Sequence, residues 1–272
     1  MPEMRIAGRR VTWREAGEGP PVVLAHCSLA HSGLWKPVMA ELARDFRVMA
    51  VDMPAHGGSE PPPEGVSLQL HAVECCRALL AAAGAPGHLV GLSLGGAVLG
   101  RLALAEPERV ASLTLIEPVW FHLLAEAGRP EYDDNLRFNG SITEAVRRGD
   151  LAAGARAFME AWGMRGKYEA MDGEGRAYVA ECLRHLAADF DMVDAFPPGQ
   201  VRLEDVARLR PPVLLVSVER KPAPARAVIE VLHAALPAAR REVIAGAGHL
   251  SPVSHPEAVA VLLGDFFAEA GA

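Results

Sequence analysis

The stretch HLVGLSLGGAVLGRLAL (His88–Leu104) places a serine between glycines, where an apolar run ends and a helical pattern begins. The pattern Gly91-x-Ser93-x-Gly95 in this setting is typical of a nucleophile held in a tight strand-to-helix turn. The two glycines allow the strand and the helix to pack closely around the serine. The amide of Leu94, near the helix N-terminus, is placed to stabilise an oxyanion. A phosphate-binding turn is the weaker interpretation, because both phosphate-loop glycine patterns are missing.

Outward from this turn, short apolar runs alternate with helical patterns along most of the chain. Most of the runs are apolar throughout, as in parallel strands that helices cover on both faces. Such alternation implies right-handed crossovers and a doubly wound α/β sheet. The runs read as strands are Val22–His26, Phe46–Asp52, His88–Ser93, Ala111–Glu117, Pro212–Glu219 and Arg241–His249, and the N-terminal residues alternate like a further strand pair.

The alternation of strands and helices stops between residues 120 and 205, where the pattern is helical and no convincing strand occurs. Ser141 and Glu144, in SITEAV, have the spacing of a capping box and predict the start of a helix. We expect residues 120–205 to form a helical cap over the ends of the strands. Residues 1–119 and 206–272 then form the α/β core.

The composition predicts an ordinary globular protein: 272 residues, 50% of them hydrophobic and 22% charged, can bury one sizeable core. The formal net charge of −7, without a basic block, argues against a nucleic-acid partner. No apolar run approaches the roughly 20 residues that span a bilayer, so we expect a cytoplasmic protein that does not enter the membrane. The cysteines lack metal-ligand spacing and predict free thiols: Cys27, Cys75, Cys76 and Cys182.

A serine nucleophile needs a base, and ten histidines compete for that role. His249, in AGAGHLSP, stands out because it follows the last strand in a loop of small residues. Its place after Ser93 also matches the chain order expected for a nucleophile of this type. A second oxyanion donor should come from the loop after Val22–His26, where the amide of Ser28 is well placed. His26 is expected to order that loop.

Five pieces of sequence carry a family resemblance: LAHCSLAHSGLW, VDMPAHGGSEPP, VGLSLGGAV, LTLIEPV and GAGHLSPVSHPEAV. With them the chain resembles the α/β-hydrolase fold superfamily of serine hydrolases, over nearly its whole length apart from the cap. The resemblance implies a mostly parallel central sheet flanked by helices, with a helical cap insertion. It also implies a hydrolase of small-molecule esters, lactones, amides or carbon–carbon bonds that needs no cofactor and no metal. HCSLAHSGLW and AHGGSE loosely resemble loops of enol-lactone hydrolases.

Two positions depart from the family pattern. Cys27 stands where a glycine usually follows the loop histidine, but the donor there is a backbone amide, so function survives in principle. Lys221 aligns with the aspartate that usually completes the triad. The acid could instead be Glu117, which ends the strand beside that of Ser93, or Glu219, at the end of the penultimate strand; a Ser–His dyad is the third option. We favour Glu117, because its strand ends at the carboxyl edge where active sites of open α/β sheets lie.

The sequence therefore predicts a hydrolase that cleaves a small, largely apolar ester or lactone through a Ser–His–acid mechanism with an acyl-enzyme intermediate. Trp162 and Met164, where glycines interrupt the cap helices, are expected to line the substrate pocket. One alternative is a non-catalytic binding protein for small molecules on the same scaffold, which the missing aspartate favours. Another is a carbon–carbon bond hydrolase or lyase of the same fold.

Overall fold

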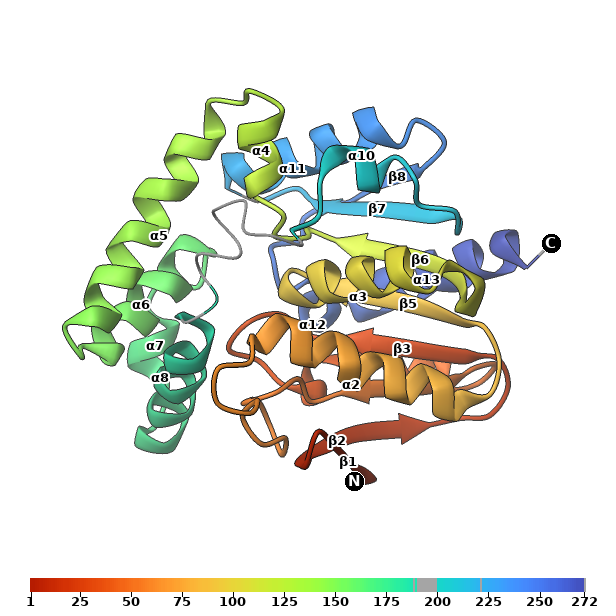
Figure 1. Ribbon diagram of the computed structural model, residues 1–272, viewed down its shortest axis with the longest axis horizontal. Coiled ribbons are helices and arrows are strands. Elements are labelled where there is room, and N and C mark those ends of the chain that lie inside the picture. Colours follow the sequence, from red (N-terminus) through yellow and green to blue (C-terminus); the bar gives the residue numbers. More distant parts are fainter. Residues whose placement is uncertain (188, 190–199, 221, 272) are drawn as a thin grey trace.

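The centre of the computed structural model is an eight-stranded, mostly parallel sheet (Figure 1). The structure describes residues 1–187, 189, 200–220 and 222–271. The strands are β1 (Glu3–Ile6), β2 (Arg9–Ala16), β3 (Pro21–Ala25), β4 (Arg47–Val51), β5 (Gly87–Leu92), β6 (Val110–Ile116), β7 (Val213–Val218) and β8 (Arg240–Ile244). They lie in the order β1-β2-β4-β3-β5-β6-β7-β8, and β3 to β8 run parallel, whereas β2 is antiparallel to its two neighbours. The predicted α/β sheet is confirmed, although its last strand ends at Ile244 and leaves His249 in the loop that follows.

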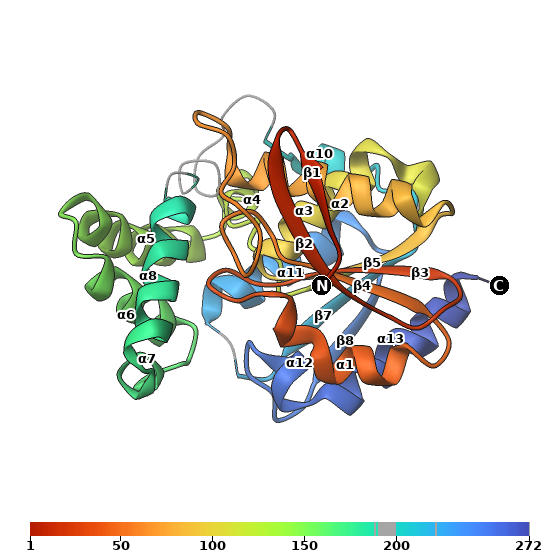
Figure 2. The same cartoon turned by 90° about the horizontal axis from the view of Figure 1, so that it is seen from below.

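Helices cover both faces of the sheet, as Figure 2 shows. One layer contains α2 (Leu68–Ala83), α3 (Leu94–Ala105), α10 (Leu203–Val206) and α11 (Ala223–Ala235), and the other contains α1 (Lys36–Leu42), α12 (Ser251–Ser254) and α13 (Pro256–Ala270); two short 3₁₀ helices span Ser32–Trp35 and Pro107–Arg109. Val23 and Leu89 share a hydrophobic core with the first layer, and Val22 and Val90 share a separate core with the second. Because successive side chains of a strand point to opposite faces, strands covered on both sides are apolar throughout.

The chain between β6 and β7 forms a group of helices beyond the carboxyl ends of the parallel strands (Figure 1). They are α4 (His122–Glu126), α5 (Glu131–Arg147), α6 (Leu151–Ala161), α7 (Lys167–Ala170) and α8 (Gly173–Ala187). The predicted helical insertion is present, while its assignment as a separate cap of residues 120–205 stays a prediction, because part of that range lies outside the described residues. Among the described helices, none is long and apolar enough to cross a membrane.

The capping box predicted at Ser141 is wrong. Ser141 lies inside α5, and its hydroxyl donates a hydrogen bond to the carbonyl oxygen of Phe138 at 2.8 Å. The helix begins after Pro130 with acidic residues in its first turn, which the positive end of the helix dipole favours. The Ser141–Glu144 spacing therefore lies within a longer helix, α5, which begins ten residues earlier at Glu131.

Candidate active site

Ser93 occupies a strained turn between β5 and α3. Its φ is 57°, in the left-handed region, and its amide donates a hydrogen bond to Ile116 O of β6 at 2.8 Å. A Cβ atom built on Gly91 would lie 2.3 Å from the carbonyl oxygen of Gly95, and one built on Gly95 would lie 2.2 Å from Ala25 O. Only glycine fits at either position, so the two glycines of the motif allow the backbone to approach closely around the serine.

A buried histidine–carboxylate pair lies at the same edge of the sheet. Nδ1 of His249 donates a hydrogen bond to Oε2 of Glu117 at 2.9 Å, and the Glu117 side chain is fully buried. The other carboxylate oxygen accepts a hydrogen bond from the Val218 amide at 3.4 Å. A proton on Nδ1 leaves Nε2 of His249 as the basic nitrogen, which is the tautomer that a general base for a serine requires.

The second candidate acid, Glu219, is separate from this pair. Its Oε2 accepts a hydrogen bond from the Gly246 amide at 2.6 Å, and the residue is exposed. Glu219 thus braces the turn after β8, through which the chain reaches His249. Lys221, at the usual position of the triad aspartate, lies outside the described residues. Of the two glutamates predicted as the acid, only Glu117 contacts the histidine in the described structure.

Trp162, the C-cap of α6, covers the imidazole ring of His249. The ring centroids lie 4.1 Å apart with an interplanar angle of 32°. In this arrangement Ser93 Oγ and His249 Nε2 are not hydrogen-bonded. Catalytic hydrogen bonds are often long without substrate and tighten when it binds. Trp162 was predicted to line the pocket, but its stacking on His249 could not be predicted, because the contact joins α6 to the loop after β8.

The two backbone amides predicted as oxyanion donors are those of Leu94 and Ser28. Leu94 is the first residue of α3, so its amide has no acceptor within the helix. Ser28 lies in the loop after β3, next to Cys27, whose thiol has its pKa raised to about 12 by burial and stays neutral. His26 orders this loop, since its Nε2 accepts a hydrogen bond from the Met53 amide at 3.0 Å. The role of the two amides in stabilising a negative charge near Ser93 stays a prediction.

An apolar cavity of about 200 Å³ adjoins Trp162 on the insertion side. Its lining comes from the helical insertion and from the start of α11, and it includes Phe121, Asn135, Phe138, Trp162, Pro222 and Ala225. Met164 does not line this cavity; it is half-buried against the hydrophobic core of the insertion. Gly163, with a φ of 78°, ends α6 as the sequence predicted. The indole of Trp162 is therefore a wall between the cavity and His249.

Comparison with known proteins shows the family of this chain. The model of the alpha/beta hydrolase family matches residues 22–262. The chain belongs to the alpha/beta hydrolase family. It is 30% identical to a 2-hydroxymuconate semialdehyde hydrolase of Pseudomonas putida over 285 aligned residues, which cover 99% of this chain and 95% of that protein.

Other relatives of this α/β hydrolase match it over a shorter length or only in fold. A pimeloyl-[acyl-carrier protein] methyl ester esterase of Methylococcus capsulatus is 36% identical over 164 residues, and the alignment covers 58% of this chain and 59% of that protein. The crystal structure of the enol-lactonase from Burkholderia xenovorans LB400 superimposes with a TM-score of 0.75 at 20% identity, covering 98% of this chain and all of that one. This last likeness concerns the fold alone.

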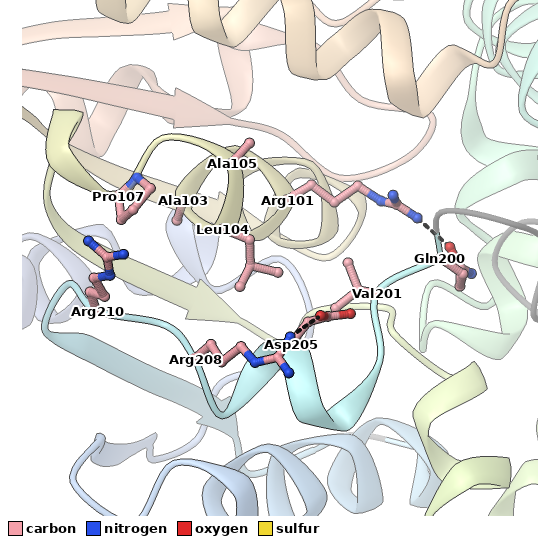
Figure 3. Close-up of a pocket in the computed structure, with 10 residues that line it drawn as sticks. All are labelled: Arg101, Ala103, Leu104, Ala105, Pro107, Gln200, Val201, Asp205, Arg208 and Arg210. Atoms are coloured by element: carbon pink, nitrogen blue, oxygen red, sulfur yellow. Dashed lines mark hydrogen bonds and ion pairs between the residues drawn. The ribbon is translucent and has the colours of Figure 1, made fainter.

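The α/β hydrolase has a second, larger hollow of about 720 Å³ away from the candidate triad (Figure 3). It lies between α3 and the segment around α10, and neither Ser93 nor His249 lines it. Its arginines already have partners: Arg101 donates to Gln200, Arg208 pairs with Asp205 at 3.5 Å, and Arg210 pairs with Glu108 at 2.6 Å. Among the described residues, no group of histidine, cysteine or acidic side chains is arranged to hold a metal ion.

Proposed function

We propose that this α/β hydrolase is a serine hydrolase that cleaves small, largely apolar esters or lactones. The observation that carries the proposal is the buried hydrogen bond from His249 to Glu117, next to a serine in a strained turn. A fully buried carboxylate is costly unless it is paired. A protein that only binds a ligand gains nothing from keeping this pair beside a nucleophile, so the pair argues against the non-catalytic alternative.

The proposed reaction has two halves. Nε2 of His249 takes the proton of Ser93 Oγ as the oxygen attacks the carbonyl carbon, and the protonated imidazole is stabilised by Glu117. The oxyanion is held by the amides of Leu94 and Ser28, and each such donor contributes about 3 kcal/mol in the transition state. The tetrahedral intermediate then collapses: its bond to the alkoxide oxygen breaks, the imidazolium protonates that oxygen, and the acyl-enzyme is left. Water, deprotonated by His249, releases the acid in the same way.

The surroundings of the site support an apolar substrate with few polar groups. The cavity behind Trp162, which the indole separates from His249, is lined mainly by aromatic rings, prolines and alanines, so the insertion side of the site is apolar. Within the described residues, the buried indole nitrogen of Trp162 has no hydrogen-bond partner, which leaves one donor for a substrate oxygen. The pimeloyl-[acyl-carrier protein] methyl ester esterase of Methylococcus capsulatus acts on an ester, as its name states.

Carbon–carbon bond hydrolysis is the second candidate. It is favoured by one observation: the relative that aligns with the whole chain at 30% identity is a 2-hydroxymuconate semialdehyde hydrolase. The fold and a Ser–His–acid site serve both reactions, so the substrate decides between them.

We place the protein in the cytoplasm, because the described free thiols are all buried and a reducing compartment preserves them.

The test combines active-site labelling with a substrate panel. We expect a fluorophosphonate to label the wild-type protein once, and p-nitrophenyl esters, small lactones and 2-hydroxymuconate semialdehyde to rank its preference. Ser93→Ala should abolish labelling and lower kcat by about 10⁴-fold or more. His249→Ala should lose as much, and the double variant little more, because the two residues act as a unit. Full labelling of Ser93→Ala, or no turnover of any panel member, would refute the proposal.

A further inference from the structure

The loop that carries Ser28 is strained and is held mostly from outside. Leu29 has a φ of 60°, a conformation that a leucine rarely adopts. Within the loop, the Ala30 amide donates a hydrogen bond to Cys27 O at a long 3.4 Å. Such a backbone persists only when surrounding contacts fix it. The position of the Ser28 amide therefore depends on the groups that touch Leu29 and Ala30.

One of these groups comes from the helical insertion. The hydroxyl of Tyr178, on α8, donates a hydrogen bond to Ala30 O at 2.8 Å and accepts one from the Gly57 amide at 3.0 Å. The edge of the His31 ring also faces Tyr178, with centroids 6.1 Å apart. Burial raises the pKa of the Tyr178 phenol, so the hydroxyl keeps its proton and remains a donor at any working pH.

The other group comes from the loop after β4. Nε2 of His56 accepts a hydrogen bond from the Leu29 amide at 3.3 Å, while its Nδ1 donates to Pro54 O at 2.9 Å. This tautomer leaves His56 neutral, and the residue is buried. Tyr178 of the insertion and His56 of the core thus bond to the backbone of Ala30 and Leu29, the two residues that follow Ser28.

We infer that Tyr178 and His56 are positioning residues that aim the Ser28 amide at the oxyanion, so that docking of α8 on the core sets transition-state stabilisation. The inference rests on the proposed function. Neither residue touches the reacting atoms; each acts through the backbone of the loop. It follows that a shift of α8 away from Ala30 would slow the reaction even if the hydrogen bond between His249 and Glu117 stayed in place.

The test compares an ester with its thionoester, in which sulfur replaces the carbonyl oxygen. Sulfur is a weak hydrogen-bond acceptor, so the amides of Leu94 and Ser28 stabilise the transition state of the thionoester much less than that of the ester. We expect Tyr178→Phe to lower kcat for the ester by about tenfold, with KM changed by less than about twofold, because only transition-state stabilisation is lost. The thionoester should lose far less, so the ester-to-thionoester rate ratio falls. The matched control is Tyr168→Phe, which removes a hydroxyl from α7 and should leave the ratio unchanged.

An unchanged ratio in a folded Tyr178→Phe would overturn the inference, and so would an equal loss for both substrates, which marks a general structural effect. Folding is checked by circular dichroism and thermal unfolding. If Tyr178→Phe does not fold, His56→Leu removes the acceptor for the Leu29 amide from the core side and must lower the same ratio. Failure of the proposed function is distinct, because the wild-type protein would then show no Ser93-dependent turnover of the ester.

Discussion

At the scale of single residues, the candidate site concentrates backbone strain. Ser93 and Glu117 both have a positive φ, at 57° and 46°, and they follow neighbouring strands. The amide of Ser93 bonds to the residue just before Glu117, at Ile116 O. Outliers of this kind cost about 1–3 kcal/mol each and persist where the surroundings over-determine them. The proposed nucleophile and the proposed acid are thus positioned together by the ladder between β5 and β6.

The choice of acid gives a direct prediction. Glu117→Gln should lower kcat by about 10³–10⁴-fold, because the carboxylate that stabilises the imidazolium and holds its tautomer is lost. Glu219→Gln should keep near-normal kcat, since Glu219 bonds to the Gly246 amide and not to His249. Steady-state kinetics at several pH values, on variants with native circular dichroism, decides the matter. The assignment fails if Glu219→Gln alone loses activity, and a dyad is indicated if both variants keep it.

Trp162 gives a second prediction at this scale. Trp162→Ala should join the adjoining cavity to the space above His249 and shift chain-length preference toward longer acyl groups. We expect the rate for a p-nitrophenyl octanoate relative to the acetate to rise at least about tenfold. Met159→Ala is the control, because Met159 is buried in the same insertion and does not line the cavity. A large fall in melting temperature for Trp162→Ala, with the octanoate-to-acetate rate ratio unchanged, would assign the indole to the core.

How much of the site the sequence could predict depended on whether a residue lies at a strand end, where a local pattern or the sheet topology marks it. Ser93 and His249 follow strands in recognisable local contexts, and Glu117 could be selected because parallel strands end at one edge. The contacts of Tyr178 could not be predicted, since they join residues 148 and 121 positions apart in the sequence. No local pattern marks a tyrosine on an amphipathic helix as the partner of a particular loop carbonyl.

At the scale of elements, β5, α3 and β3 pack without room for side chains at the turn. The strands could be predicted because burial on both faces makes them apolar, whereas the start of α5 could not, because a serine inside a helix imitates a cap. The close approach at Gly95, by contrast, is visible only in the structure, where its missing Cβ would meet Ala25 O.

This packing predicts opposite effects for two glycine-to-alanine changes. Gly95→Ala should lower the free energy of unfolding by about 2–4 kcal/mol, because backbone must shift to admit the methyl group. Gly140→Ala, on the exposed side of α5 with nothing within 4 Å, should raise it by about 0.5–1 kcal/mol. Urea unfolding followed by circular dichroism measures both. A Gly95→Ala variant as stable as the wild type would contradict the close-packing account.

At the scale of the whole molecule, buried histidines make stability depend on pH. Burial, with the nearby charge of His56, lowers the pKa of His26 to about 3, and burial lowers the pKa of His56 and of His88 to about 4. Between these values and the ordinary pKa near 6.5, the unfolded chain binds protons that the folded chain does not. The stabilisation is therefore complete above about pH 6.5 and is lost as the pH falls toward 4.

We expect the free energy of unfolding to fall between pH 7 and pH 5, with a slope that approaches about 1.4 kcal/mol per pH unit for each of these histidines. Urea titrations at several pH values give the slope. His88 is remote from the candidate triad. His88→Gln should reduce the slope of the unfolding free energy against pH by the contribution of one histidine. Stability that is flat from pH 7 to pH 5 would show that these imidazoles titrate normally in the folded protein.

The strained backbone at Ser93 and Glu117 has an evolutionary consequence. Because φ is positive at both positions and one of them buries a carboxylate, the fold is kept less stable there than it could be. Selection for turnover and selection for melting temperature pull in opposite directions at these residues. A duplicate gene relieved of catalysis would be expected to drift toward glycine or asparagine at one of them and become more heat-resistant. Recovering the enzyme from such a descendant would then require it to give up stability first.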